Sequence, residues 1–140
     1  MKNRTRKKLP KWLCAAAGDG RVGDLRKALS LGADPDARHE GSTALYLAAV
    51  QGEYRCASLL LRAGASPNLE SRGRRDGLPL AAVAAHADLP LAELLLRYGA
   101  DPLLPESGGG TALDWARGWV EDADAHRAVE ELLVRAASQA

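Results

Sequence analysis

Apolar residues in the middle of the chain recur at helical spacing in two short runs that a glycine separates. Residues 44–51 read ALYLAAVQ, and Thr43 before them carries a hydroxyl that can cap the first turn. After Gly52, the apolar positions of residues 56–61 form a broad stripe, and Gly64 supplies the positive φ of a helix C-terminus. The pattern predicts a helix, a turn and a second, antiparallel helix.

The same pattern recurs along the chain. Gly-Ala is found at residues 32, 64 and 99, at intervals of 32 and 35 residues. LLLRAGASP at 59–67 matches LLLRYGADP at 94–102, and the TAL of residues 43–45 returns at 111–113 and, as LPL, at 78–80. Because helices this short are not stable alone, each pair must bury its apolar face against a neighbour. The repetition therefore predicts stacked helical pairs.

In period and motifs this chain resembles the ankyrin-repeat family, over all but its first dozen residues. The resemblance implies an all-α fold, an ankyrin-repeat solenoid of helix-turn-helix units with short β-hairpin or turn tips. It implies one domain over residues 12–140, with a basic N-terminal arm at residues 1–11 outside it. The four repeats are expected at about residues 12–38, 39–70, 71–104 and 105–137.

Local chemistry predicts individual helix boundaries in the later repeats. Pro79 and Pro90 suit the first turns of the third repeat's two helices, and Asp88 stands as a cap before the second. Leu78 replaces the usual threonine, which removes one hydrogen bond between repeats. The last repeat holds several more residues than the second between its two helical runs, and this predicts an insertion at residues 119–124.

Composition and charge limit the classes of function. At 140 residues the chain suits a single domain, and its hydrophobic fraction of 46% contains no Phe or Ile, so packing depends on Leu, Ala and Val. A net charge of +1, from 19 basic and 18 acidic residues, gives no global case for nucleic acid or membranes. The apolar run at residues 12–17 is short for a secretory signal, and no run reaches transmembrane length. We therefore expect a cytoplasmic protein.

Basic residues are concentrated at the N-terminus. Residues 1 to about 10 carry charge and almost nothing to bury, so we expect them to be disordered or loosely helical. A solvated tail is the favoured interpretation. The alternative is weak attachment to nucleic acid or anionic lipid through Lys2, Arg4, Arg6, Lys7 and Lys8.

No group of residues indicates catalysis or a metal site. The three histidines fall in different repeats, and Cys14 and Cys56 lack Cys-x-x-Cys spacing, so we expect these cysteines to be buried free thiols. The glycines at 108–110 are not followed by the Gly-Lys-Ser/Thr of a phosphate loop and predict a flexible hairpin tip. We expect no enzymatic activity, no cofactor and no small-molecule substrate.

The resemblance implies recognition of another protein. In ankyrin solenoids the first helices line a concave surface and the turn tips project beside it, so the variable positions contact the partner. These positions are the tip residues His39, Glu40, Ser42, Arg72, Arg74 and Arg75, and the first-helix residues Tyr46, Val50, Gln51, His86 and Trp119. Tyr, Trp and Arg are also the residue types that dominate interface energetics.

The resemblance thus implies a non-catalytic protein–protein interaction module, expected to be a monomer, that binds through its concave helix face and hairpin tips. Arg74 and Arg75 favour an acidic surface on the partner. Within this class the chain could be a stoichiometric inhibitor or immunity protein of an enzyme, or an adaptor. Attachment to nucleic acid or membranes through the basic arm is the alternative class.

Overall fold

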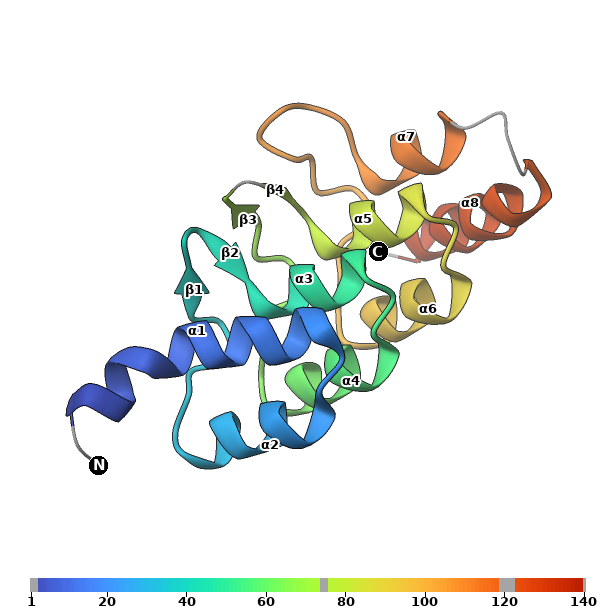
Figure 1. Cartoon of the computed structure of the whole chain (residues 1–140). Coiled ribbons are helices and arrows are strands. Elements are labelled where there is room, and N and C mark those ends of the chain that lie inside the picture. The colour runs from blue at the N-terminus through green and yellow to red at the C-terminus, as the bar shows by residue number, and fades with distance from the viewer. Residues whose placement is uncertain (1–2, 74–75, 119–122, 140) are drawn as a thin grey trace.

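The computed structural model describes residues 3–73, 76–118 and 123–139, which form four helical pairs and two short hairpins (Figure 1). The pairs are α1 (Asn3–Asp19) with α2 (Val22–Ser30), α3 (Ala44–Val50) with α4 (Tyr54–Arg62), α5 (Pro79–Ala85) with α6 (Leu89–Arg97), and α7 (Ala112–Arg117) with α8 (Ala123–Ser138). The antiparallel hairpins are β1 (Arg38–His39) with β2 (Ser42–Thr43), and β3 (Ser71–Arg72) with β4 (Asp76–Gly77).

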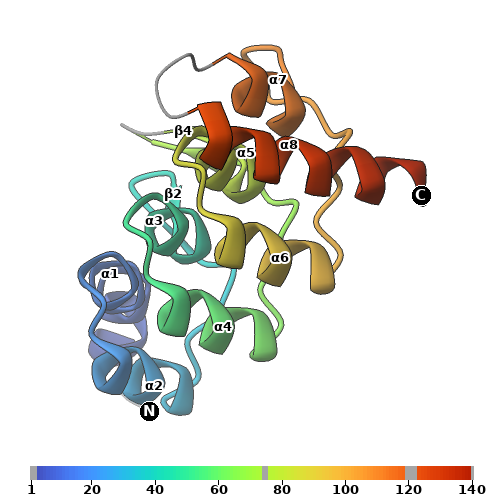
Figure 2. The same ribbon diagram turned by 90° about the vertical axis from the view of Figure 1, so that its right-hand side faces the viewer.

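The helices stack in two layers. The first helices of each pair, α1, α3, α5 and α7, contact one another in order, and the second helices α2, α4, α6 and α8 form the other layer (Figure 2). Fully buried leucines from both layers form the core between successive pairs, among them Leu13, Leu45, Leu60 and Leu95. This arrangement confirms the predicted all-α solenoid of helix-turn-helix units with short hairpin tips.

Helix starts follow the local chemistry. The Thr43 hydroxyl accepts a hydrogen bond from the Tyr46 N–H at 3.3 Å, and the Asp88 carboxylate accepts one from the Leu91 N–H at 3.2 Å. Pro79 and Pro90 lie in the first turns of α5 and α6, where a missing N–H leaves no intrahelical bond unmade. These four sequence predictions are therefore confirmed.

Backbone N–H groups just before the first helices link successive repeats. The Thr43 N–H donates to the Ser71 hydroxyl at 3.2 Å, and the Leu78 N–H donates to Glu106 Oε2 at 2.8 Å. The side chain of Leu78 is apolar and cannot accept a hydrogen bond, so it does not cap α5. Its backbone nevertheless keeps a hydrogen bond to the following repeat, because Glu106 reaches back to it.

The N-terminal segment, which was expected to be disordered or loosely helical, is helical from residue 3. Helix α1 begins at Asn3 and runs through residue 11, where a separate arm was expected to end, without a break. Leu9 is buried in the same core cluster as Leu13, four residues further along the helix face. Of the two expected forms, the helical one is found for residues 3–10, and Leu9 gives this segment an apolar side chain to bury.

The last pair, α7 with α8, agrees only in part with what the sequence predicts. Of the insertion expected at residues 119–124, residues 119–122 lie outside the described chain, and Ala123 and Asp124 open α8. Helix α8 has 16 residues where α4 and α6 have 9. The glycines at 108–110 close a turn, in which the Glu106 N–H donates to the Gly110 carbonyl at 2.9 Å. In the part of the chain that is described, no helix combines the length and apolar content of a membrane span.

Candidate functional site

A groove of about 500 Å³ lies between the first helices of the two N-terminal pairs and the β1–β2 hairpin. Three elements supply its walls. They are α1 with Lys11, Cys14, Ala15, Gly18 and Asp19, α3 with Leu47 and its C-cap Gln51, and the hairpin with His39, Glu40 and Ser42.

Helical spacing brings the α1 residues to one wall. Lys11, Ala15 and Gly18 are separated by four and three residues, so they share a face of the helix. Ala15 and Gly18 are small, and a Cβ added at Gly18 would lie 3.6 Å from the Leu47 Cβ. Small residues on α1 therefore keep the space beside α3 open.

The hairpin turn holds Glu40 out at the rim of this groove. His39 pairs with Ser42, which leaves Glu40 and Gly41 as a two-residue turn with φ of 51° and 82°. Positive φ at both positions is the I′ arrangement that matches the twist of the two strands. The Glu40 side chain is 82% exposed, so its carboxylate is available to a partner.

Charges lie at the rim of the groove and a neutral thiol lies below them. His39 Nε2 is 4.0 Å from Glu40 Oε1, and Lys11 and Asp19 add one charge of each sign. Cys14 is buried, with its Sγ 3.7 Å from the Ser42 carbonyl oxygen. Burial raises the pKa of this thiol to about 11, against a smaller lowering by a hydrogen bond from the His39 backbone. The groove can thus form polar contacts at its rim above an uncharged floor.

The raised pKa of Cys14 predicts a specific loss of stability in alkali. Below pH 9 the thiol is protonated in both folded and unfolded chains. Between pH 9 and 11 the thiol ionises in the unfolded chain but stays protonated in the folded one. Ionisation then stabilises only the unfolded state, so the free energy of unfolding falls. We expect the stability difference between the parent and Cys14→Ala to shrink by about 2 kcal/mol from pH 8 to pH 11 in urea titrations. An unchanged difference would contradict the buried, neutral thiol.

Four of the eleven predicted contact residues come together in this groove: His39, Glu40, Ser42 and Gln51. Val50, half-buried on α3, and the exposed His86 at the end of α5 lie outside its lining. Arg72 is exposed on the next hairpin and stands 3.9 Å from the Glu70 carboxylate. Arg74, Arg75 and Trp119 lie outside the residues that the structure describes.

Tyr46 requires a correction, because the structure places it inside the fold. The residue is 8% exposed. Its hydroxyl donates to the carbonyl oxygen of Asp76, 3.0 Å away on the next hairpin. The phenol of Tyr46 thus links two successive repeats.

Several residues of the groove were not among the predicted contacts. Lys11, Ala15, Gly18 and Asp19 were missed because residue 11 was taken as the end of a basic arm and no contact was expected from the first helix of the first repeat. Their spacing on one helix face was a usable signal, since Leu13 and Ala17 on α1 are buried while Lys11, Ala15 and Asp19 are exposed.

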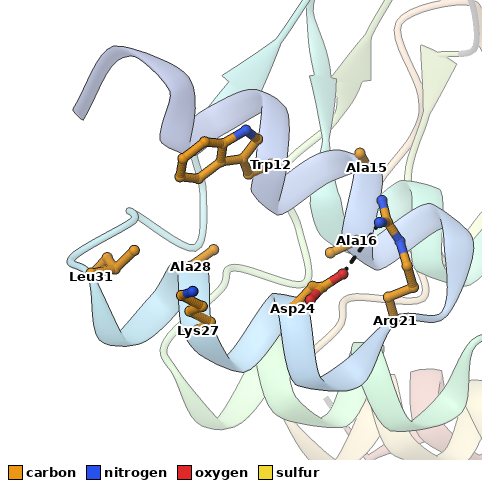
Figure 3. Close-up of a pocket in the computed structure, with 8 residues that line it drawn as sticks. All are labelled: Trp12, Ala15, Ala16, Arg21, Asp24, Lys27, Ala28 and Leu31. Carbon is orange, nitrogen blue, oxygen red and sulfur yellow. Dashed lines mark ion pairs between the residues drawn. The ribbon is translucent and has the colours of Figure 1, made fainter. Parts of the chain in front are cut away.

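A second depression, of about 260 Å³, lies on the outer side of the first helical pair (Figure 3). Trp12, 44% exposed, and Leu31 stand at one end of it, with the rest of the solenoid behind. At the other end Arg21 pairs with Asp24 at 3.2 Å. This depression offers the apolar surface of Trp12 and Leu31, and the charges of Arg21 and Asp24 are paired with each other.

A smaller depression lies at the other end of the row of tips. It is lined by Glu70, Asp76 and Glu106, and Trp115 Nε1 donates to Glu106 at 2.6 Å. The Ser107 hydroxyl and N–H both donate to Glu70, and these bonds are the main cause that lowers the pKa of that carboxyl. Within the described ranges, no group of three His, Cys, Asp or Glu side chains is placed to hold a metal ion.

Comparison with known proteins bears on the middle of the chain. A family model described as ankyrin repeat matches residues 40–72, which extend from the β1–β2 turn through α3 and α4 to β3. The chain is also similar to oxysterol-binding protein-related protein 1 of Homo sapiens, with 37% identity over 78 residues, which are 54% of this chain and 8% of that protein. This chain thus spans less than a tenth of that relative. The chain therefore contains an ankyrin repeat at residues 40–72, within its stack of helical pairs.

Proposed function

We propose that this chain is a non-catalytic module that binds another protein through the groove between α1, α3 and the β1–β2 hairpin. Ankyrin repeats in general are protein–protein interaction modules without catalytic activity. One observation carries the proposal to this groove. Variable positions from two different elements, His39, Glu40, Ser42 and Gln51, converge on a single open space.

The groove suits a partner with mixed polar chemistry. Its rim combines the ammonium of Lys11 with the carboxylates of Asp19 and Glu40. The acidic partner surface that was expected from Arg74 and Arg75 would lie beyond this groove, towards the next hairpin, on which Arg72 is exposed. Because a stable interface buries far more area than this groove contains, contacts would continue along the tips to Arg72 and along the first helices to His86.

Photo-crosslinking tests the location of the binding surface. A benzophenone amino acid at Gln51, in the groove, should capture a partner from a lysate of the native host. The same group at Glu131, exposed on α8 in the other layer, is the matched control. We expect the Gln51 adduct to contain one protein that the Glu131 adduct lacks, with mass spectrometry as the measurement.

The captured protein then allows a quantitative test. Glu40→Lys with Gln51→Ala is expected to raise its Kd by about tenfold or more, because two groove contacts are lost. Unfolding stability should stay within about 0.5 kcal/mol, since both side chains are exposed. Unchanged affinity in this variant would remove the groove from the interface.

Two subclasses of this function differ in what binding does. If the captured partner is an enzyme, a stoichiometric inhibitor or immunity protein would abolish its activity at a one-to-one ratio. An adaptor would leave that activity intact and would bind a second protein at the same time. Activity measured against the molar ratio of the two chains separates these roles.

Attachment to nucleic acid or anionic lipid is a second candidate function. Arg4, Arg6, Lys7 and Lys8 are all exposed on the first turns of α1, so an ordered helix presents four cations. Lys2 lies outside the described residues. This candidate requires binding that weakens steeply with added salt and is lost when residues 2–8 are deleted.

A further inference from the structure

Another open groove, of about 470 Å³, lies between the second helices α2 and α4. Figure 2 shows α2, α4 and α6 following one another along this layer. The groove shares no lining residue with the groove at α1 and α3. Its chemistry is set by three arginines, Arg26, Arg55 and Arg62, and by Tyr54, Val22 and Leu59.

The three arginines of this groove are exposed. No carboxylate lines the groove. In the described part of the chain, none of the three guanidinium groups forms an ion pair, whereas Arg21 and Arg117 elsewhere lie 3.3 Å or less from a carboxylate. Three unneutralised guanidinium groups along one groove give it a positive potential that attracts anions.

The spacing of the arginines defines the length of a matching ligand. Arg55 and Arg62 are seven residues apart on α4, which places them on one face about 10 Å apart along the helix axis. Arg26 reaches the groove from α2 on the other side. Carboxylates about three residues apart on an extended peptide span a similar distance, at roughly 3.3 Å per residue.

The surroundings favour a short peptide over a long polyanion. Glu93 takes in α6 the position that Ser58 has in α4, and Glu131 is exposed on α8. A nucleic acid strand that continued along this layer would therefore approach carboxylates. Tyr54 is 41% exposed, and together with the half-buried Val22 and Leu59 it offers an apolar contact between the arginines. Arginine binds carboxylates with two parallel hydrogen bonds, which suits such a peptide.

We infer that the α2–α4 groove binds a short acidic segment of a partner protein, with carboxylates on Arg26, Arg55 and Arg62 and an apolar side chain against Tyr54. This site is separate from the groove of the proposed function. A chain with both sites can hold one partner at two surfaces, or two partners at once.

Fluorescence anisotropy with the full chain at low ionic strength tests this inference. The probe is a labelled peptide of sequence Glu-Glu-Leu-Glu-Glu. Controls are the same peptide with Gln in place of Glu, and an oligothymidylate with the same number of charges. We expect saturable binding of the acidic peptide, no binding of the Gln peptide and weaker binding of the oligothymidylate.

Two charge-matched variants locate the site. Arg55→Glu with Arg62→Glu should weaken binding of the acidic peptide by about tenfold or more, whereas Lys7→Glu with Lys8→Glu, the same charge change on α1, should alter it less than about twofold. If the Arg55/Arg62 variant loses its cooperative melt, Arg26→Glu on α2 provides the same comparison. The inference is overturned if the parent does not bind the acidic peptide, if oligothymidylate binds as tightly, or if the Lys7/Lys8 variant loses binding equally.

Discussion

Leu60→Ala is expected to lower the free energy of unfolding by about 2–5 kcal/mol. Leu60 lies on α4 in the second helical pair, and its side chain is fully buried, with 0% exposed. Truncation removes apolar contacts with the core and leaves a cavity, because a close-packed core relaxes only in part around a shortened side chain. Urea titration followed by circular dichroism measures the loss.

The form of the Leu60→Ala transition is informative as well. Stability in a solenoid comes from interfaces between neighbouring repeats, so damage to an inner pair should lower the midpoint of the whole transition. Leu103→Ala is the control, because Leu103 is 54% exposed and its truncation should cost less than about 0.5 kcal/mol. An unchanged midpoint for Leu60→Ala would contradict the packing described here.

Gly41→Ala is expected to cost about 2–4 kcal/mol, an unusually large effect for a turn residue. Gly41 has a φ of 82°, and a Cβ at this position would overlap the carbonyl oxygen of Arg72 on the next hairpin. The Arg72 N–H also donates to the Gly41 carbonyl at 2.8 Å. An alanine would force the two hairpins apart and break this bond as well as strain the turn.

Gly64→Ala separates these contributions. Gly64 has a φ of 102°, but nothing lies within 4 Å of where its Cβ would stand. This variant should therefore show only the cost of a left-handed backbone, about 1–2 kcal/mol. The comparison uses thermal and urea unfolding of both variants, and a loss in Gly41→Ala no larger than that in Gly64→Ala would contradict close packing of the hairpins.

The sequence by itself determined the helical pairs and the identity of many boundaries. Apolar spacing placed Leu60 on a buried stripe, and Thr43, Pro79 and Asp88 marked helix starts that the structure contains. These features depend on residues within one or two turns of each other. Short-range hydrogen bonds and helical periodicity therefore sufficed to predict them.

The tertiary structure decided which side chains are available to a partner. Tyr46 occupies a variable position of the repeat, but its hydroxyl reaches Asp76 in the next hairpin, 30 residues away. Leu9 belongs to a segment dominated by charge, yet the packing of α1 buries it and extends the helix to Asn3. For Tyr46 the deciding contact is formed with a distant element, which no local pattern contains.

The same reason applies to the grooves and to the contact between hairpins. Arg26 and Arg55 are 29 residues apart, and they line one groove only because α2 stacks beside α4. The collision that excludes a side chain at Gly41 exists only because the two hairpins lie in contact. Local sequence determines where each helix begins and which face it buries, whereas the stacking of successive pairs decides which exposed side chains meet, since that depends on distances between repeats.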